Sequence, residues 1–418
     1  MRNYQAVIIG GGSAGLSAAV TLKKKGIQDI LVIEKDGEAG GILQQCIHNG
    51  FGLQTFKEQL SGPAYAERFI DMAAQLDVEI KLNTMVTELH ADRTIEYVNP
   101  SEGYVTISAD AVILAVGCYE RSRGAVEIPG ERPSGIYTAG QAQRYLNIDG
   151  YLVGKKVFIL GSGDIGLIMA RRMTLEGAKV YGVAELMPYS NGLPRNIKQC
   201  LDDFNIPLYL SHTVTRIYGH DRLERIEVSK VGPDRKPIRG SEMYFDIDTL
   251  LLSVGLIPEN HLADDAGIQM NPRTRGPIVD DNYMTSVKGI FACGNGLHVH
   301  DLVDFVTLEA GRAAEGAARY LNHESSSGRT VQTEAGEGIG YAVPGLIHTD
   351  DMRNNVEFFF RVRNPMDEGV ITVRCKDRVL RSITKKKLMP SEMERILLTR
   401  DQLSHLEDNL IIEVKEKH

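Results

Sequence analysis

The feature that most constrains this chain is a glycine pattern that occurs twice. In each copy an apolar run leads into three glycines spaced as GxGxxG: Gly10, Gly12 and Gly15 in the first, and Gly161, Gly163 and Gly166 in the second. Counted from the first glycine, both copies have glycines at offsets 0, 2, 5 and 16 and an acidic residue at offset 24. The pattern predicts a strand, a tight turn and a helix in each copy.

Each glycine in such a turn has a physical task. The first permits the sharp bend, the second lets the backbone approach a pyrophosphate, and the third lets helix and strand pack closely. The pyrophosphate then meets the amides at the helix N-terminus. The acidic residues, Glu34 and Glu185, stand where a carboxylate accepts hydrogen bonds from ribose hydroxyls. Repetition of all five positions favours two dinucleotide sites over two turns without a ligand.

Composition excludes several other classes. A formal charge of -8 over 418 residues argues against a nucleic-acid-binding surface. No apolar run approaches the roughly 20 residues of a membrane span, and the first predicted strand begins too near Met1 to leave room for a signal peptide. The five cysteines form no CxxC, which argues against a metal site and for a reducing compartment. We therefore expect a cytoplasmic protein without a transmembrane segment, a metal or a nucleic-acid partner.

Three later segments resemble those of flavoproteins with two dinucleotide-binding domains, such as glutathione and thioredoxin reductases. They are Asp110–Gly117, Asp248–Gly255 and Gly289–Asn295. The last of these motifs normally ends in aspartate; here Asn295 carries no charge but still donates and accepts hydrogen bonds. The resemblance implies an α/β fold with two Rossmann-like domains, the second inserted in the first, and a small β-rich domain would follow them.

The same resemblance assigns FAD to the first copy and NAD to the inserted copy. The implied FAD contacts are Gly10, Gly12, Gly15, Glu34, Gly117, Gly294, Asn295 and Thr307. The implied NAD contacts are Gly161, Gly163, Gly166 and Glu185. The Glu185 carboxylate would repel a 2'-phosphate, and no lysine or arginine follows it through Tyr189, so we expect NADH rather than NADPH.

A helix after the third motif should direct its N-terminus at the flavin, with the amides of Val306 and Thr307 as candidates. Four polar residues crowd the approach to this helix: His298, His300, Asp301 and Asp304. Two interpretations stay open. Either the segment is a polar loop in which Asp304 is the helix N-cap, or one of these residues transfers protons.

The segment Gly40–Gly52 has one cysteine, Cys46, where disulphide-reducing relatives have two. Cys46 matches neither position of the glutathione reductase pair, and the CxxC of thioredoxin reductases is absent. We therefore expect no redox disulphide. Cys46 and His48, together with His300, are the candidate catalytic residues; the alternative is that Cys46 and His48 are simply buried.

Two stretches, Gln45–Gly52 and Pro129–Gln143, resemble a narrower family. It includes the α subunits of dye-linked proline dehydrogenase, opine oxidase and hydrogen cyanide synthase, and flavoproteins found beside anaerobic glycerol-3-phosphate dehydrogenase. The resemblance implies an FAD-dependent NAD(P)H oxidoreductase that exchanges electrons with a second, substrate-oxidising or electron-accepting subunit or with a small acceptor. A homo-oligomer is compatible with it.

Two other functions stay open: direct flavin-dependent oxidation of an amino acid, opine or polyol phosphate, and a non-catalytic NAD/FAD redox sensor that binds other proteins.

We predict an FAD-binding domain at 1–120 and 259–325 and an NAD-binding domain at 145–258. A glycine-rich linker over 325–340 would lead into a small β-rich domain at 330–418 that docks a partner. Alternating residues predict strands at 356–363, 370–375 and 411–414, and Pro390 could open a short helix. The phenylalanines Phe358–Phe360 either place one face in a core or form a docking surface.

Overall fold

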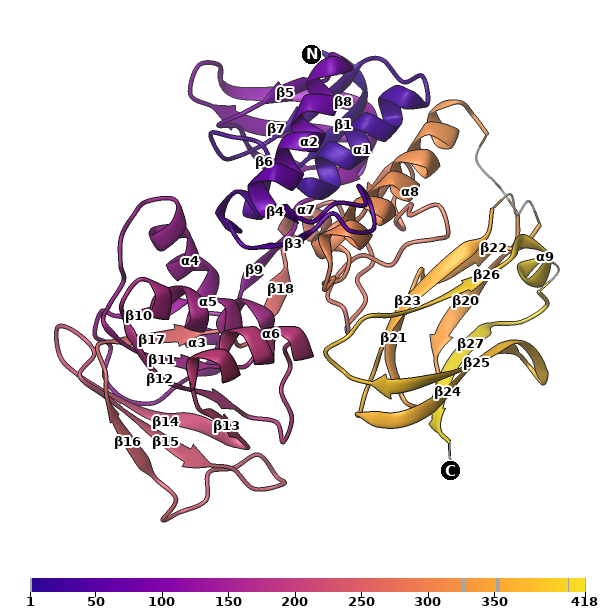
Figure 1. The fold of residues 1–418 in the computed structure, drawn as a ribbon. Coiled ribbons are helices and arrows are strands. Elements are labelled where there is room, and N and C mark those ends of the chain that lie inside the picture. The colour runs from indigo at the N-terminus through magenta and orange to yellow at the C-terminus, as the bar shows by residue number, and fades with distance from the viewer. Residues whose placement is uncertain (1, 325–327, 351–353, 405, 418) are drawn as a thin grey trace. The chain divides into compact units, whose positions relative to one another are not determined.

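A computed structural model describes residues 2–324, 328–350, 354–404 and 406–417 (Figure 1). The chain divides into two compact units: Met1–Cys118 with Pro258–His418, and Tyr119–Ile257. The second unit is therefore an insertion in the first. Among the described residues, no helix has both the length and the apolar character that crossing a membrane requires.

A seven-stranded sheet forms the centre of the first unit. Its order is β5-β2-β1-β8-β7-β6, and β19 also pairs with β8. The pairs that β1 makes with β2 and β8 are parallel, whereas β6, β7 and β8 are antiparallel. The strands are β1 (Asn3–Ile9), β2 (Ile30–Ile33), β5 (Glu79–Lys81), β6 (Met85–Leu89), β7 (Thr94–Asn99), β8 (Gly103–Leu114) and β19 (Ile290–Ala292).

Helices bury the apolar strands of this sheet. The residues of β1 from Ala6 to Ile9 are all buried, as expected for a central parallel strand covered on both faces. Helix α1 (Ser13–Lys24) contacts α8 (Val303–Leu321), for example through the Ser17 hydroxyl, which donates to the Thr307 carbonyl. Four alanines of α8 are buried in the same core: Ala310, Ala313, Ala314 and Ala317.

The remaining short elements of this region are the helices α2 (Gly62–Gln75) and α7 (His261–Asp265), the 3-10 helices η1 (Gly41–Gln45) and η3 (Gly294–Gly296), and the strands β3 (Asn49–Phe51) and β4 (Leu60–Ser61).

The second unit also has a central sheet of parallel strands with helices, and this sheet has five strands. Its main sheet is parallel in the order β10-β17-β11-β12-β13, and a second, antiparallel sheet has the order β14-β15-β16. The main sheet comprises β10 (Ile136–Thr138), β11 (Lys156–Leu160), β12 (Lys179–Glu185), β13 (Leu208–Leu210) and β17 (Thr249–Leu252). The other consists of β14 (His212–Tyr218), β15 (Arg225–Lys230) and β16 (Met243–Asp246). The helices are α3 (Arg123–Val126), α4 (Ala139–Asn147), α5 (Asp164–Leu175), α6 (Pro194–Cys200) and the 3-10 helix η2 (Asp202–Phe204).

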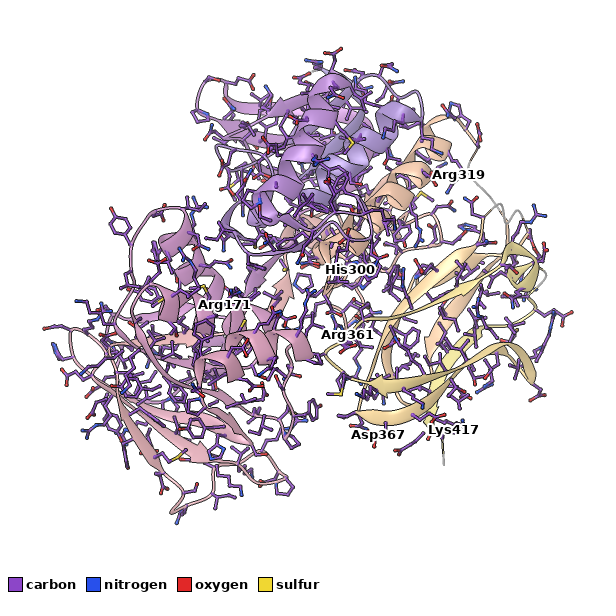
Figure 2. The ribbon with its side chains drawn as sticks, in the orientation of Figure 1. Arg171, His300, Arg319, Arg361, Asp367 and Lys417 are labelled. Atoms are coloured by element: carbon purple, nitrogen blue, oxygen red, sulfur yellow. The ribbon has the colours of Figure 1, made fainter. Side chains whose placement is uncertain are left out.

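The C-terminal region, from Thr330 onward, is β-rich as predicted, and we call it the β module. It has a five-stranded sheet, β22-β20-β27-β24-β25, and a three-stranded sheet, β21-β23-β26. Their strands are β20 (Thr330–Ala335), β21 (Ile339–Val343), β22 (Leu346–His348), β23 (Val356–Val362), β24 (Met366–Cys375), β25 (Arg378–Leu388), β26 (Glu394–Leu398) and β27 (Leu410–Glu416), with one short helix, α9 (Arg400–Leu403). Figure 2 labels Arg361 on β23, and His300 in the loop that precedes α8.

The predicted fold class is confirmed, but two local predictions are wrong. Residues 330–335 of the expected linker form strand β20, because Val331 enters the module core; positions 325–327 lie outside the described residues. The expected helix after Pro390 is absent from the described residues there, and Glu394–Leu398 is strand β26 with its first, third and fifth residues buried. All three phenylalanines of β23 are buried, so none lies on an exposed docking surface.

Candidate functional site

The first glycine turn has the close contacts that its sequence predicts. Gly10 adopts a φ of 109°, and a Cβ there would lie 2.4 Å from the Ala115 carbonyl oxygen. A Cβ at Gly15 would lie 1.8 Å from the Gly10 carbonyl oxygen. At Gly12, by contrast, a Cβ would meet nothing nearer than a Cα at 4.0 Å, so the backbone of Gly12 borders open space. This is the arrangement that admits a pyrophosphate beside α1, and the residues fit FAD.

Glu34 stands at the end of β2 with its carboxylate held in place. The side chain is buried, and it accepts hydrogen bonds from the backbone amides of Gly11 at 2.7 Å and Asp36 at 2.9 Å. An oriented carboxylate with unused lone pairs can accept hydrogen bonds from a ribose diol.

The second turn has the same construction within its own unit. Gly161 has a φ of 96°, and a Cβ there would lie 2.1 Å from the Ser253 carbonyl oxygen. At Gly166 a Cβ would lie 2.7 Å from the Ser253 Cβ. The buried Glu185 carboxylate accepts three hydrogen bonds. The donors are the Ser162 amide at 3.0 Å, the Ser162 hydroxyl at 2.6 Å and the Met187 amide at 2.9 Å. These residues fit a nicotinamide dinucleotide.

The duplication extends further than the sequence analysis recognised. After the acidic residue the chain passes back over each glycine turn: Gly40 donates its amide to the Gly11 carbonyl at 2.8 Å, and Asn191 donates its amide to the Ser162 hydroxyl at 2.9 Å. One residue later, at offset 31 in both copies, the chain has a glycine again, Gly41 and Gly192. A sixth matched position was therefore available as a signal in the sequence.

The third motif brings Gly294 and Asn295 next to the end of β8. Asn295 accepts a hydrogen bond from the His300 amide at 3.0 Å through Oδ1, and its Nδ2 lies 3.6 Å from the Cys118 sulfur as donor. Gly117, next to Cys118, has a φ of 75°. The structure thus groups the predicted FAD residues Gly117, Gly294 and Asn295, and the amide of Asn295 is oriented by contacts on both of its ends.

The prediction that Asp304 caps α8 is wrong. The helix begins at Val303 with Leu302 as its N-cap, and the buried Asp304 carboxylate points away to another segment. It accepts hydrogen bonds from the amides of Gly52 at 3.1 Å and Thr55 at 2.8 Å. The amides of Gly52 and Thr55 follow β3 in the chain and need an acceptor, which Asp304 supplies. Asp304 therefore holds the end of the Gly40–Gly52 segment against α8.

Thr307 lies in the second turn of α8, where its hydroxyl is already engaged. Thr307 Oγ1 lies 2.8 Å from the Tyr65 hydroxyl, and its carbonyl accepts a hydrogen bond from Ser17 at 2.8 Å. These bonds join α8 to α1 and α2. A direct contact between Thr307 and FAD stays a prediction.

Cys46 lies just after η1 and is partly buried. Its thiol donates to the Ile42 carbonyl at 3.3 Å, and burial raises the pKa of Cys46 to about 12. A thiol with this pKa is protonated near neutral pH and is a poor nucleophile. His48 is also partly buried, with its ring 5.1 Å from that of Phe51. A catalytic role for either residue stays a prediction.

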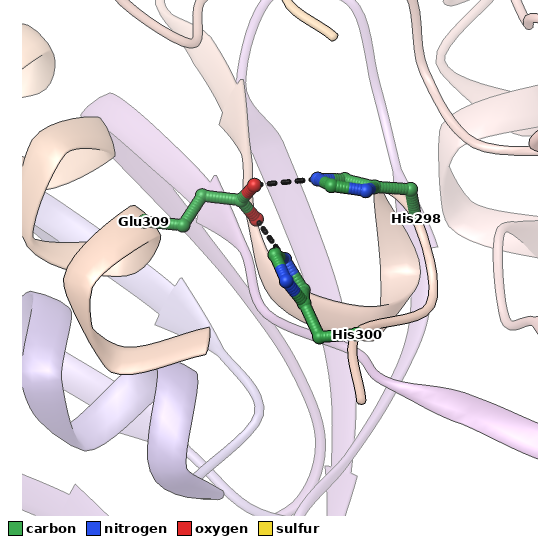
Figure 3. A group of neighbouring side chains, drawn as sticks. All are labelled: His298, His300 and Glu309. Atoms are coloured by element: carbon green, nitrogen blue, oxygen red, sulfur yellow. Dashed lines mark hydrogen bonds and ion pairs between the residues drawn. The ribbon is translucent and has the colours of Figure 1, made fainter. Parts of the chain in front are cut away.

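His298, His300 and Glu309 form a buried cluster between the third motif and α8 (Figure 3). His298 Nε2 lies 2.6 Å from one carboxylate oxygen of Glu309, and His300 Nε2 lies 3.2 Å from the other. Burial alone would raise the pKa of Glu309, but the two imidazoles hold it well below its usual range, while burial lowers the pKa of His298. Both pKa shifts are explained if the Glu309 carboxylate is ionised and His298 is neutral. The neutral imidazole then donates its Nε2 hydrogen to the carboxylate.

The cluster has the residue types of a metal site, but its geometry favours hydrogen bonding. Two ligands of a tetrahedral zinc ion lie about 3.3 Å apart, farther than the 2.6 Å between His298 and Glu309. Metal-bound histidines usually donate their second ring nitrogen to an acceptor, whereas Nδ1 of both histidines has no partner among the described residues. The short His298–Glu309 contact is a hydrogen bond, whereas His300 Nε2 lies near the carboxylate without one among the described residues. We therefore interpret the cluster as a support of the Gly294 turn, whose amide Glu309 also accepts at 2.7 Å.

A known protein family matches most of the chain. A family described as pyridine nucleotide-disulphide oxidoreductase matches residues 4–357, which is most of the chain. The chain belongs to this family. Members of the pyridine nucleotide-disulphide oxidoreductase family use FAD and a pyridine nucleotide, so the protein is an FAD-dependent NAD(P)H oxidoreductase.

Similar proteins include components of larger enzymes. Hydrogen cyanide synthase subunit HcnB of Pseudomonas protegens is 26% identical over 330 residues, which cover 74% of this chain and 67% of that protein. The glutamate synthase [NADPH] small chain of Escherichia coli is 27% identical over 346 residues, covering 75% of this chain and 68% of that one. An opine oxidase subunit of Agrobacterium tumefaciens is 24% identical, covering 70% of this chain and 61% of that protein.

Among solved structures, the thioredoxin reductase of T. acidophilum is similar with a TM-score of 0.63 and 26% identity, covering 78% of this chain and all of that one. The L-proline dehydrogenase of P. horikoshii has a TM-score of 0.51 at 18% identity and shares the fold over 75% of this chain and 54% of its own. The family match ends at residue 357, so it leaves out most of the β module.

Proposed function

We propose that the protein exchanges a hydride between NAD(H) and FAD and passes electrons to or from a partner subunit or a small acceptor without a redox disulphide. The observation that carries this proposal is that the segment Gly40–Gly52, where disulphide-reducing relatives have a redox pair, has a single cysteine, Cys46. Its thiol is partly buried and donates to the Ile42 carbonyl at 3.3 Å, and burial raises its pKa to about 12.

The residues that would hold FAD are Gly10, Gly12, Gly15, Glu34, Gly117, Gly294, Asn295 and Thr307, and those for NAD are Gly161, Gly163, Gly166 and Glu185. The bound cofactors supply the hydride chemistry, and the protein supplies binding, orientation and exclusion of water. The glycines would keep side chains away from the pyrophosphates and the carboxylates would orient the riboses, while Asn295 presents an amide whose oxygen accepts the His300 amide.

NADH is the nucleotide that the second site favours. The Glu185 carboxylate accepts three hydrogen bonds from its own unit and is fixed at the end of β12. A fixed negative charge attracts ribose hydroxyls and repels a 2'-phosphate.

A partner protein is supported by the similar proteins. Hydrogen cyanide synthase subunit HcnB and the opine oxidase protein are both named as subunits, and the glutamate synthase small chain is named as one chain of its enzyme. A flavin that lacks a disulphide relay must deliver electrons directly, so an acceptor or donor has to reach the flavin itself.

Anaerobic rapid mixing of the FAD-loaded protein with NADH or NADPH tests the proposal. We expect the visible flavin band to bleach with NADH, and to bleach more slowly at the same concentration of NADPH. A flavin that stays oxidised with both nucleotides would contradict the nicotinamide half of the proposal.

A further inference from the structure

One face of strand β23 is directed at the loop that precedes α8. Side chains alternate along a strand, so Phe358 and Phe360 enter the core of the β module while the residues between and beside them face the other way. Those residues are Glu357, Phe359 and Arg361. An acid, an aromatic ring and a base thus lie in a row on one face.

Each residue of this row contacts the region around α8. Glu357 makes an ion pair with Arg312 of α8 at 2.8 Å. The Phe359 ring lies 5.6 Å from the ring of His298 and 5.5 Å from that of His300. Phe359 is 1% exposed although it lies outside the module core, because the two imidazoles cover it.

Arg361 holds the same loop at two further points. Its guanidinium donates to the Val299 carbonyl at 3.1 Å and to the carboxylate of Asp301. The second oxygen of Asp301 accepts the amide of Met393, which is also a residue of the module. Four consecutive loop residues, 298–301, therefore each contact the β module.

The loop connects these contacts to the third flavin motif. The His300 amide orients Asn295, and Glu309 accepts both the Gly294 amide and the His298 imidazole. Phe359 packs against both imidazoles that lie next to this buried carboxylate. Hydrogen bonds to a buried charge are stronger than the same bonds in water, and exposure to water would weaken them.

We propose that the β module is part of the flavin-binding site, and that Phe359 and Arg361 are positioning residues that hold the loop 298–301, and through it Gly294 and Asn295, in the conformation that retains FAD. This inference rests on the proposed FAD site. From the sequence alone, we expect the module to dock a partner. Beyond that role, the isolated chain needs the module to retain FAD.

The test measures the FAD dissociation constant of full-length deflavo protein by flavin fluorescence, together with the visible circular dichroism of the bound flavin. We expect Phe359→Ala and Arg361→Ala each to raise the constant about tenfold or more and to change the circular dichroism. Phe359→Leu keeps an apolar cover and should stay within about threefold of wild type. The matched control is Arg378→Ala, at an exposed position of β25, and we expect no change.

A second variant guards against misfolding of Arg361→Ala, which removes several buried contacts of the module at once. Asp301→Asn breaks the same ion pair from the loop side. A double-mutant cycle between the two positions should show that their effects on FAD affinity are coupled. Folded Phe359→Ala and Asp301→Asn proteins that bind FAD like wild type would overturn the inference. Wild-type protein that fails to bind FAD would instead contradict the proposed function.

Discussion

Two kinds of residue bear on the chemistry of this chain. Glycines leave space for a cofactor in the two turns, and the protonated thiol of Cys46 limits its reactivity. At Gly15 and Gly161 a Cβ would collide with backbone atoms, so the turns require glycine for packing. At Gly12 no such collision occurs, and the open space beside its backbone is what a pyrophosphate needs. Cys46 belongs to the second kind, because its raised pKa keeps the thiol protonated.

Replacing Cys46 with serine tests whether the sulfur takes part in catalysis. The serine hydroxyl can still donate to the Ile42 carbonyl, so the local structure should persist. We expect the rate of flavin reduction by NADH, measured anaerobically by rapid mixing, to stay within about twofold of wild type. A fall of two orders of magnitude in a folded, FAD-loaded variant would show that the thiol is catalytic.

Glu185→Gln tests nucleotide selectivity. The change removes the charge that we propose favours ribose hydroxyls over a 2'-phosphate, and a charge-assisted hydrogen bond of this kind contributes about 1.5 to 3 kcal/mol. We expect the KM for NADH to rise about tenfold while the KM for NADPH does not rise. Steady-state kinetics with both nucleotides measure this, and Glu176→Gln, an exposed residue after α5, is the matched control. Equal increases for both nucleotides would argue against the assigned role.

At the scale of elements, α8 is the point where several segments meet. Its first turn holds the Gly40–Gly52 segment through Asp304, and its second turn joins α1 and α2 through Thr307 and supports the Gly294 motif through Glu309. The three residues lie within the first two turns and project from different sides of α8, so a single helix fixes the relative positions of three parts of the FAD region.

Asp304→Asn should loosen one of these parts selectively. Asparagine has a single acceptor oxygen, so one of the two amides, of Gly52 or Thr55, loses its partner at a cost of about 2 kcal/mol. We expect hydrogen–deuterium exchange in residues 49–60 to become at least about tenfold faster, as measured by mass spectrometry. Exchange elsewhere in α8, and throughout an Asp71→Asn control on the exposed face of α2, should stay as in wild type. Unchanged exchange in 49–60 would mean that Asp304 does not fix the segment.

At the scale of the whole molecule, the β module is joined to the FAD region by a second, pH-dependent contact. His348 of β22 lies 2.7 Å from the Asp281 carboxylate and 3.8 Å from that of Asp280. Burial, with repulsion from Asp281, raises the pKa of Asp280 to about 6, and the hydrogen bond to Asp281 raises the pKa of His348. Both groups bind protons more tightly in the folded chain than in the unfolded one, so stability is lost as pH rises through their folded-state pKa values.

Asp280→Asn should remove part of this pH dependence. Asparagine can still accept the amides of Asn282 and Met284, but it has no charge to desolvate. Between about pH 4 and pH 6 the wild-type folded state binds the extra proton and its stability falls as the pH rises, so we expect the variant to unfold at a higher temperature than wild type at pH 8 and the difference to be clearly smaller at pH 5. Thermal unfolding at the two pH values measures this. A difference that does not grow with pH would contradict the assignment.

The sequence allowed the two nucleotide-binding turns to be predicted residue by residue, because their glycines and acids are local requirements of one short backbone path. It did not allow the partners of Asp304 or Glu309 to be predicted, since the Asp304 contacts join positions about 250 residues apart and depend on how α8 packs. The sequence of β20 is mostly polar and follows a serine- and glycine-rich stretch, so it resembles a linker. Only the burial of Val331 in the module core identifies it as a strand. Alternation along the predicted strand indicates that Glu357, Phe359 and Arg361 share one face. It does not indicate that this face contacts α8 and the loop 298–301.

An anaerobic titration of the FAD-loaded protein with NADH tests the central claim most directly. A flavin and a redox disulphide each accept two electrons, so a sulfur-free site takes up one equivalent of NADH per FAD, and a site with a disulphide relay takes up two. We predict that the visible flavin band is fully bleached at one equivalent and that no cysteine thiols are gained. Complete reduction only at two equivalents, with two new thiols per chain, would contradict the account.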